Sequence, residues 1–162
     1  SIDQLANCIE ELIKGNDNRR LVVSHWNPGE FNSMALLPCH LQYQFSLSSD
    51  DTLDILMYQR SCDFPIGIPY NVASYSLLLK IVCAITGLNP GTFTHFMADI
   101  HIYENQLQLF KDQLRREANY SPKFKMPVIK SLEDIENGSI TADDFEICDY
   151  NHHPFIKYPF SV

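Results

Sequence analysis

The chain has 162 residues, of which 45% are hydrophobic and 12% aromatic, so it is long enough to bury a core as one domain. Its net charge is -8 with only 12 Lys and Arg residues, which argues against a broad binding surface for duplex nucleic acid. Its five cysteines lack the spacing of a zinc site, and no apolar run of membrane-spanning length or secretory signal is expected, so we predict a cytoplasmic protein without a metal site.

The N-terminal part of the chain is predicted to form a helix followed by a short strand. Apolar residues recur at helical spacing over residues 2–14, and a polar segment at 15–18 ends that helix. Residues 21–24 read as a short buried strand. Trp, Asn, Pro and Gly then break the pattern, so residues 25–34 are expected to be a loop.

Two strands follow, at residues 40–47 and 52–60, joined by a polar hairpin turn at 48–51. If these strands pair in an antiparallel hairpin, Cys39 and Arg60 lie at the same end of neighbouring strands. This proximity depends on the register, because a slip by one residue would move the two side chains apart.

The longest apolar segment, residues 71–86, is predicted to be a central helix that ends at Gly87. The elements expected after it are a strand at 92–103, an amphipathic helix at 104–116 and, within the Pro-containing segment 119–162, a short acidic helix near 131–136. The pattern indicates an α+β fold, with a mixed sheet backed by helices in a single domain over residues 1–162.

Cys39 is the strongest candidate for a catalytic residue. It follows an apolar run and a proline, it precedes His40, and Arg60 is expected close enough to favour a thiolate. The alternative is a buried, inert cysteine, which is what we expect for Cys62, Cys83 and Cys148.

Several motifs together resemble the thymidylate synthase family over essentially the whole chain. They are Trp26-Asn27-Pro28, Met34-Ala35-Leu36, Pro38-Cys39-His40, Tyr58-Gln59-Arg60-Ser61-Cys62-Asp63, Gly67, Pro69, Asn71-Val72-Ala73-Ser74-Tyr75 and His101-Ile102-Tyr103. The resemblance implies that the chain is the C-terminal portion of a longer catalytic domain, whose missing N-terminal part carries further catalytic and folate-binding residues.

The resemblance implies reductive methylation of dUMP, with 5,10-methylenetetrahydrofolate as cosubstrate. Cys39 would be the nucleophile and Arg60 would favour its thiolate, while His40 would order water. Asn71 would recognise O4 and N3–H of uracil, although its position also suits a helix cap. The implied dUMP-binding residues are Arg19, Arg20, Arg60, Ser61, Asn71, His101 and Tyr103.

His101 and Tyr103 are expected on one face of a strand, where both could reach the sugar 3′-OH; without the motif they would be an ordinary half-buried pair. Arg19 and Arg20 alone suggest a solvated turn, but the resemblance implies a homodimer in which they bind phosphate in the partner's site. Folate-binding residues are implied at Asp63, Gly67 and Val162. The alternatives are that Asp63 is a turn residue and that Val162 belongs to a poorly ordered terminus.

Some positions depart from the usual family pattern, and they cluster near the implied folate pocket and the C-terminal tail. They are His25, Leu37, Pro65, Tyr70, Ala98 and the tail Tyr158-Pro159-Phe160-Ser161-Val162. A wetter folate pocket would favour water over hydride in the last step, so a dUMP hydroxymethylase is the second hypothesis. A third, from another class, is a noncatalytic binding fragment, which the acidic composition disfavours.

Overall fold

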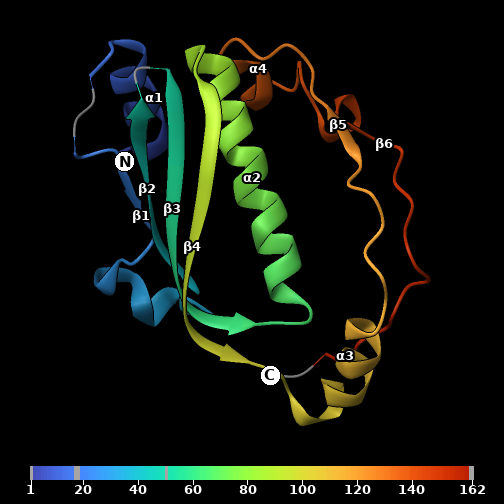
Figure 1. The fold of residues 1–162 in the computed structure, drawn as a ribbon. Coiled ribbons are helices and arrows are strands. Elements are labelled where there is room, and N and C mark those ends of the chain that lie inside the picture. The colour runs from blue at the N-terminus through green and yellow to red at the C-terminus, as the bar shows by residue number, and fades with distance from the viewer. Residues whose placement is uncertain (1, 17–18, 50, 161–162) are drawn as a thin grey trace. The chain divides into compact units, whose positions relative to one another are not determined.

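The computed structural model describes residues 2–16, 19–49 and 51–160 (Figure 1). The chain divides after His101 into two compact units, residues 1–101 and 102–162. The first unit holds nearly all of the predicted site residues. The single domain predicted over residues 1–162 stays a prediction.

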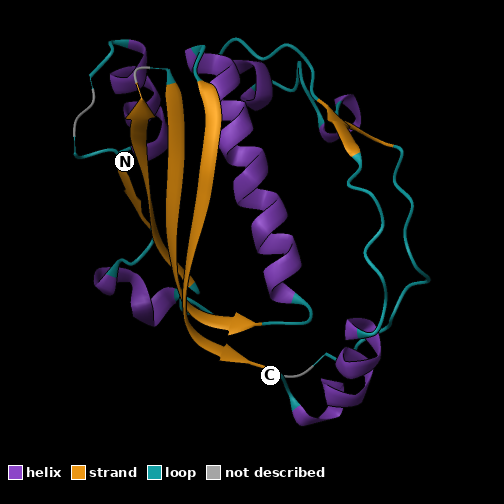
Figure 2. Ribbon diagram, viewed as in Figure 1, coloured by secondary structure: helices purple, strands orange, loops and turns teal. Residues whose placement is uncertain are grey.

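In its described residues, the first unit is a four-stranded mixed sheet with two α-helices and one 3-10 helix (Figure 2). The strands lie in the order β1-β2-β3-β4; the first two neighbouring pairs are antiparallel and β3 and β4 are parallel. This confirms the α+β class and the mixed sheet. Its elements are α1 (Gln4–Ile13), β1 (Val22–Ser24), the 3-10 helix η1 (Pro28–Ser33), β2 (His40–Ser49), β3 (Thr52–Asp63), α2 (Gly67–Thr86) and β4 (Asn89–His101).

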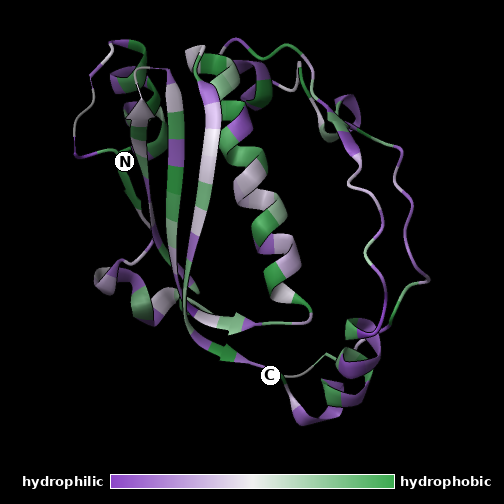
Figure 3. Cartoon of the chain, in the orientation of Figure 1, coloured by the Kyte–Doolittle hydropathy of each residue, from purple (hydrophilic) through white to green (hydrophobic). Residues whose placement is uncertain are grey.

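The core lies on one face of this sheet, and β3 supplies its centre. Leu53, Ile55 and Met57 are each 0% exposed, because alternate residues of a strand point to the same face. The apolar bands along β3 are visible in Figure 3. On the opposite face Leu56 of β3 and Phe96 of β4 are exposed, so that face is not covered within the first unit.

The helix α2 forms the crossover between the parallel strands β3 and β4 and packs against both. It begins at Gly67, four residues earlier than predicted, because Pro69 is tolerated in the first turn of a helix. It ends as predicted at Gly87, whose φ of 77° is a left-handed conformation that glycine adopts without strain.

By length and composition, α2 could span a membrane, with a mean hydropathy of 1.5, so the expectation that no apolar run is long enough was wrong. In this fold the apolar character of α2 comes from its packing in the core. Five of its residues are buried as part of the core: Ile68, Tyr75, Leu79, Val82 and Cys83. A buried core helix is apolar on more of its surface than a helix at the protein surface.

The other predicted elements of the first unit are confirmed with small shifts at their ends. The helix α1 is capped by Asp3, whose carboxylate accepts from the Ala6 N–H at 2.9 Å. The hairpin is confirmed by the pairing of Ser49 with Thr52, although Asp50 lies outside the described residues. The predicted loop at 25–34 contains instead η1, which Asn27 caps by accepting from the Gly29 N–H.

A register shift in the hairpin lies at the start of β2. His40 pairs with Gln59 and Gln42 pairs with Tyr58, so Leu41 is the extra residue of a β-bulge. A bulge bends its strand and changes the direction of nearby side chains. It lies directly beside Cys39.

The second unit is less regular, with a two-stranded antiparallel sheet, β5-β6. The helix predicted at 104–116 is shorter and starts as a 3-10 turn, and the acidic helix near 131–136 is confirmed. The elements are η2 (Glu104–Gln106), α3 (Leu107–Leu114), β5 (Lys123–Lys125), α4 (Glu133–Glu136), η3 (Ala142–Asp144) and β6 (Glu146–Cys148). Gln106 is fully buried and its Nε2 donates to the Pro159 carbonyl at 3.0 Å.

Candidate active site

Cys39 lies immediately before β2 and is half-buried. Its carbonyl accepts the backbone N–H of Arg60 at 2.9 Å, and the next residue, His40, pairs with Gln59. The prediction that Cys39 and Arg60 lie at the same end of adjacent antiparallel strands is therefore confirmed. The neighbouring strand thus fixes the backbone that carries the candidate nucleophile.

The Arg60 side chain holds the segment that leads into Cys39. Its Nε donates to the Pro38 carbonyl at 2.9 Å and its Nη2 donates to the Leu37 carbonyl at 2.8 Å. The guanidinium carbon also lies 5.9 Å from the centre of the Trp26 ring, a cation–π distance. One cation therefore joins β3 to two separate parts of the segment between β1 and β2.

We expect Arg60→Lys to lower the free energy of unfolding by about 2 kcal/mol, because an ammonium group cannot replace a planar fork bonded to two carbonyls. Urea unfolding measures this loss. The matched control is Arg115→Lys, which changes a largely exposed arginine paired with Asp112 and should cost less than about 0.5 kcal/mol. Equal losses in both variants would contradict the structural role of Arg60.

His40 links Cys39 to the helix α2. Its Nδ1 lies 3.3 Å from the Tyr75 hydroxyl, and the two rings meet edge to face at 5.3 Å. Asn71 is on the same helix, four residues before Tyr75, and its side chain acts to raise the pKa of His40. Asn71 lies in the second turn of α2, past its first residue Gly67, so the alternative that it caps this helix is wrong.

Gln59 connects Asn71 to the sheet. It is 3% exposed, and its Nε2 donates to Asn71 Oδ1 at 3.0 Å and to the Ser61 carbonyl at 2.9 Å. Its Oε1 lies 2.8 Å from Nε2 of His95 on β4. Residues of β3, β4 and α2 thus form one part-buried polar network around Asn71, and Tyr75 of the same helix connects α2 to His40, the neighbour of Cys39.

Burial lowers the pKa of both His40 and His95 below the ordinary value of 6.5. Nearby His25 lowers the pKa of His40 further, while the polar side chain of Asn71 opposes the shift. For His95, the neighbouring His40 acts in the same direction as burial. Both imidazoles are therefore neutral near pH 7 and contribute no positive charge to the network.

These lowered pKa values predict that the protein is less stable in weak acid. Below about pH 6.5 the unfolded chain takes up protons at these histidines more readily than the folded chain does, so stability falls until the folded pKa values are passed. The melting temperature should drop between about pH 7.5 and about pH 5.5. The double variant His40→Gln, His95→Gln should show a flatter profile, and an unchanged slope would contradict this origin.

The residues after Arg60 continue along β3 beside β4. Ser61 is half-buried and pairs with Asp99, while Asp63 pairs with His101. The Asp63 carboxylate accepts from the Ile66 N–H at 3.3 Å, so the turn role considered for it is present. A Cβ on Gly67 would meet Asp63 Cβ at 3.6 Å and Asn71 Oδ1 at 3.7 Å, which is ordinary contact. Packing within the first unit therefore does not require this glycine.

The strand prediction is confirmed for His101, the last residue of β4, and was wrong for Tyr103. β4 ends at His101, whose Nδ1 lies 3.5 Å from the Asp99 carboxylate. Tyr103 follows the strand, because the chain turns there into the 3-10 helix η2, and its carbonyl accepts the Gln106 N–H at 2.9 Å. The two residues therefore do not alternate on one strand face. Val162 lies outside the described residues.

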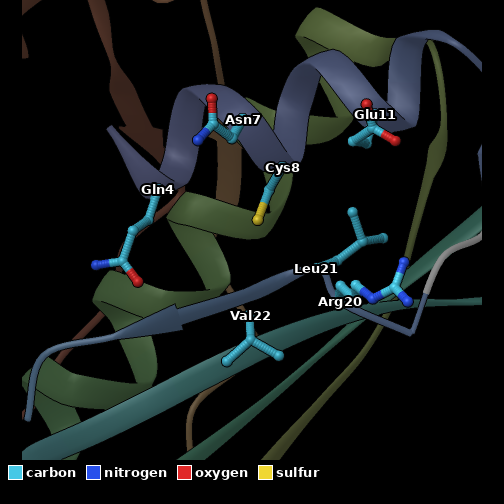
Figure 4. Close-up of a pocket in the computed structure, with 7 residues that line it drawn as sticks. All are labelled: Gln4, Asn7, Cys8, Glu11, Arg20, Leu21 and Val22. Carbon is cyan, nitrogen blue, oxygen red and sulfur yellow. The ribbon is translucent and has the colours of Figure 1, made fainter. Parts of the chain in front are cut away.

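Arg19 and Arg20 are exposed in the turn before β1. Arg20 lines a pocket of about 360 Å³ between α1 and β1 (Figure 4). The residues around this pocket are Gln4, Asn7, Cys8, Glu11, Arg20, Leu21 and Val22. Neither Cys39 nor Asn71 is among them, so the pocket is distinct from the network described above.

Comparison with known proteins agrees with these motifs. The family model for thymidylate synthase matches residues 1–162. The thymidylate synthase of Shewanella halifaxensis is 47% identical over 164 aligned positions, which cover 100% of this chain and 57% of the relative. That of Vibrio parahaemolyticus is 45% identical over 99% of this chain, and that of Mycoplasma pneumoniae is 46% identical over 96%. The chain belongs to the thymidylate synthase family.

The match covers only part of each of these thymidylate synthases. The chain spans 57% of the relative from Shewanella halifaxensis and 52% of the relative from Mycoplasma pneumoniae.

The cysteines differ in their surroundings, and none of the five forms a disulfide. Cys62 and Cys83 are buried as predicted, and burial raises the pKa of both thiols, in Cys83 to about 11. Cys148 was expected to be buried, but it is half-buried. It lies in the two-stranded sheet of the second unit, near the side chains of Lys125 and Glu146. Within residues 2–16, 19–49 and 51–160, no three His, Cys, Asp or Glu side chains gather to hold a metal ion.

Three residues of this network were not among the predicted site residues: Gln59, Tyr75 and His95. The sequence did contain a signal for two of them. Gln59 is the next residue in the alternating series Leu53, Ile55 and Met57, whose side chains point into the core. A polar residue at a core position needs hydrogen-bond partners. His95 occupies the equivalent inward position on β4, between Phe93 and Met97.

Proposed function

We propose that this chain carries the nucleophile and the pyrimidine-recognition residues of an enzyme that methylates dUMP at C5, with 5,10-methylenetetrahydrofolate as cosubstrate. The observation that carries the proposal is that His40, the neighbour of Cys39, contacts Tyr75 of α2, the helix that also carries Asn71. We also propose that the chain corresponds to the C-terminal portion of such an enzyme and acts in the cytoplasm, in keeping with its five unpaired cysteines.

The chemistry explains the need for a thiolate. The Cys39 thiolate adds to C6 of uracil, which turns C5 into an enolate carbon that attacks the one-carbon unit of the folate. C5 then loses its proton, and departure of the folate leaves an exocyclic methylene. A hydride from tetrahydrofolate converts this methylene to methyl, producing dihydrofolate, and the bond between Cys39 and C6 breaks to release dTMP.

Asn71 is proposed to recognise uracil through its side-chain amide. Its oxygen would accept from N3–H and its NH₂ would donate to O4, a pattern opposite to that needed for cytosine. His40 is proposed to order water beside the reacting ring. Its lowered pKa supports this assignment, because a neutral imidazole can both donate and accept.

Phosphate binding is assigned to Arg60 and Ser61, and to Arg19 and Arg20 from a second copy. The carbonyls of Leu37 and Pro38 take two of the five N–H groups of the Arg60 guanidinium, and we propose that a remaining donor binds phosphate. His101 and Tyr103 are proposed to bind the deoxyribose 3′-OH. They would reach it from the end of β4 and from the segment after β4, not from one face of a strand.

We propose a homodimer formed through the uncovered face of the sheet. This face carries Leu56, Phe96 and Ile100, which are 43%, 58% and 49% exposed, and Tyr58 stacks on Phe96 at 5.4 Å. Phe96→Asp should therefore convert a dimer to a monomer in analytical ultracentrifugation. A dimer of unchanged affinity would reject this face as the interface.

Folate is assigned to Asp63, Gly67 and Val162. A second outcome of the chemistry is supported by departures from the family pattern beside these residues: Pro65 is buried in the turn after β3, and Tyr70 is 71% exposed at the start of α2. If the folate pocket admits water, water adds to the exocyclic methylene, and the products are 5-hydroxymethyl-dUMP and tetrahydrofolate.

Product analysis by mass, with dUMP, methylenetetrahydrofolate and the protein at its full natural length, tests the proposal. We expect thymidylate together with dihydrofolate. Formation of 5-hydroxymethyl-dUMP with tetrahydrofolate would replace the synthase by the hydroxymethylase. Absence of any product, with a folded protein, would reject both enzymes in favour of a noncatalytic binding fragment.

A further inference from the structure

The side-chain amide of Asn71 is held by a chain of hydrogen bonds that begins at His95. His95 Nε2 lies 2.8 Å from Gln59 Oε1, and Gln59 Nε2 donates to Asn71 Oδ1 at 3.0 Å. An amide oxygen only accepts hydrogen bonds, so His95 must carry its hydrogen on Nε2. The direction of every bond in this chain is thereby set.

The Ser61 carbonyl fixes Gln59 from a third side. It accepts the other hydrogen of Gln59 Nε2 at 2.9 Å. Rotating the Gln59 amide by half a turn would place Oε1 against this carbonyl and Nε2 against the N–H of His95. Because Gln59 is only 3% exposed, solvent could not replace the hydrogen bonds lost by this rotation.

His95 is in turn held as a neutral donor. Among the described residues, its Nδ1 is one of two buried side-chain nitrogen or oxygen atoms that lack a hydrogen-bond partner, the other being Gln106 Oε1. A hydrogen on Nδ1 would therefore be a buried donor without an acceptor, and burial lowers the pKa of the ring. The ring also stacks on Phe93 at 5.4 Å, which fixes its plane.

The orientation of the Asn71 amide matters because asparagine by itself does not distinguish the two pyrimidines. One orientation offers an acceptor to N3–H and a donor to O4 of uracil. The flipped orientation offers a donor to N3 and an acceptor to the amino group of cytosine. Flipping Asn71 in this protein would bring its NH₂ against the NH₂ of Gln59.

We propose that His95 is a positioning residue that, through Gln59, locks the Asn71 amide in the orientation that accepts uracil and rejects cytosine. The proposal rests on the function proposed above for Asn71. It adds a specificity determinant on β4, two hydrogen bonds away from Asn71 and three from the base.

The test compares binding of dUMP and dCMP by calorimetry in the protein at its full natural length. His95→Phe keeps a flat ring but removes the donor, and His95→Gln restores an N–H donor. We expect His95→Phe to lower the preference for dUMP over dCMP at least about tenfold, the effect of losing a buried polar pairing, and His95→Gln to recover most of it. An unchanged preference in a folded His95→Phe protein would overturn the proposal.

A second measurement uses the unliganded wild-type protein and so does not depend on nucleotide binding or on a variant that folds. Nitrogen NMR of the His95 ring should show hydrogen on Nε2 alone at neutral pH, and hydrogen on Nδ1 or on both nitrogens would overturn the lock. If the wild type binds neither nucleotide, the proposed function and the selection of uracil both fail, while the ring tautomer still decides whether the hydrogen-bond lock exists.

Discussion

In the protein at its full natural length, the proposed function predicts that Cys39→Ser abolishes turnover of dUMP while leaving the protein folded. At neutral pH a serine hydroxyl is almost wholly protonated and a much weaker nucleophile than a thiolate, so we expect a fall in kcat of about a thousandfold or more, equivalent to at least about 4 kcal/mol of activation free energy. The substitution is nearly isosteric at a half-buried position, so urea unfolding should change little.

The matched control is Cys148→Ser, which makes the same chemical change at another half-buried cysteine. It lies in β6, outside the network around Asn71, and should keep wild-type kcat. Near-normal turnover by Cys39→Ser would contradict its assignment as the nucleophile. Equal losses in the two variants would show that the effect does not come from nucleophilic attack by Cys39.

Ile55→Ala should strongly destabilise the first unit. Ile55 is 0% exposed at the centre of β3, where it pairs with Phe45 of β2 and Phe93 of β4. Removing its side chain leaves a cavity that rigid neighbouring strands cannot fill, so we expect the free energy of unfolding to fall by about 2–5 kcal/mol in urea unfolding.

Ile13→Ala is the control for this loss, because the same atoms are removed from a side chain that is 60% exposed at the end of α1. Alanine is also the better helix former, so the net change should stay within about 0.5 kcal/mol. Comparable losses for Ile13→Ala and Ile55→Ala would contradict the assignment of the core to the inward face of β3.

Local patterns predicted most of the first unit because they depend on nearby residues. The alternation of Leu53, Ile55 and Met57 predicted β3, and Gly87 predicted the end of α2. The start of α2 was placed too late because Pro69 was read as part of a loop, although a proline fits the first turn of a helix. The 3-10 helix η1 was missed because Asn27 and Pro28 also suit an irregular loop.

The candidate site was predicted less completely, because it depends on contacts between distant parts of the chain. Pairing geometry was enough to bring Cys39 beside Arg60. The contact of His40 with Tyr75 crosses 35 positions and that of Gln59 with His95 crosses 36. Such contacts follow from the parallel crossover through α2, which no local pattern specifies. The family motifs named Asn71, but the structure was needed to show what holds it.

The most direct test of the central claim is covalent capture of Cys39. The protein at its full natural length is incubated with 5-fluoro-dUMP and methylenetetrahydrofolate, and the adduct is located by peptide mass spectrometry. Fluorine replaces the C5 proton that must leave, so the reaction should stop with the nucleotide bonded to Cys39 through C6. An adduct on the peptide that contains Cys39, absent in Cys39→Ser, is the predicted result. A folded protein with no adduct, or with the adduct at another cysteine, would contradict the account.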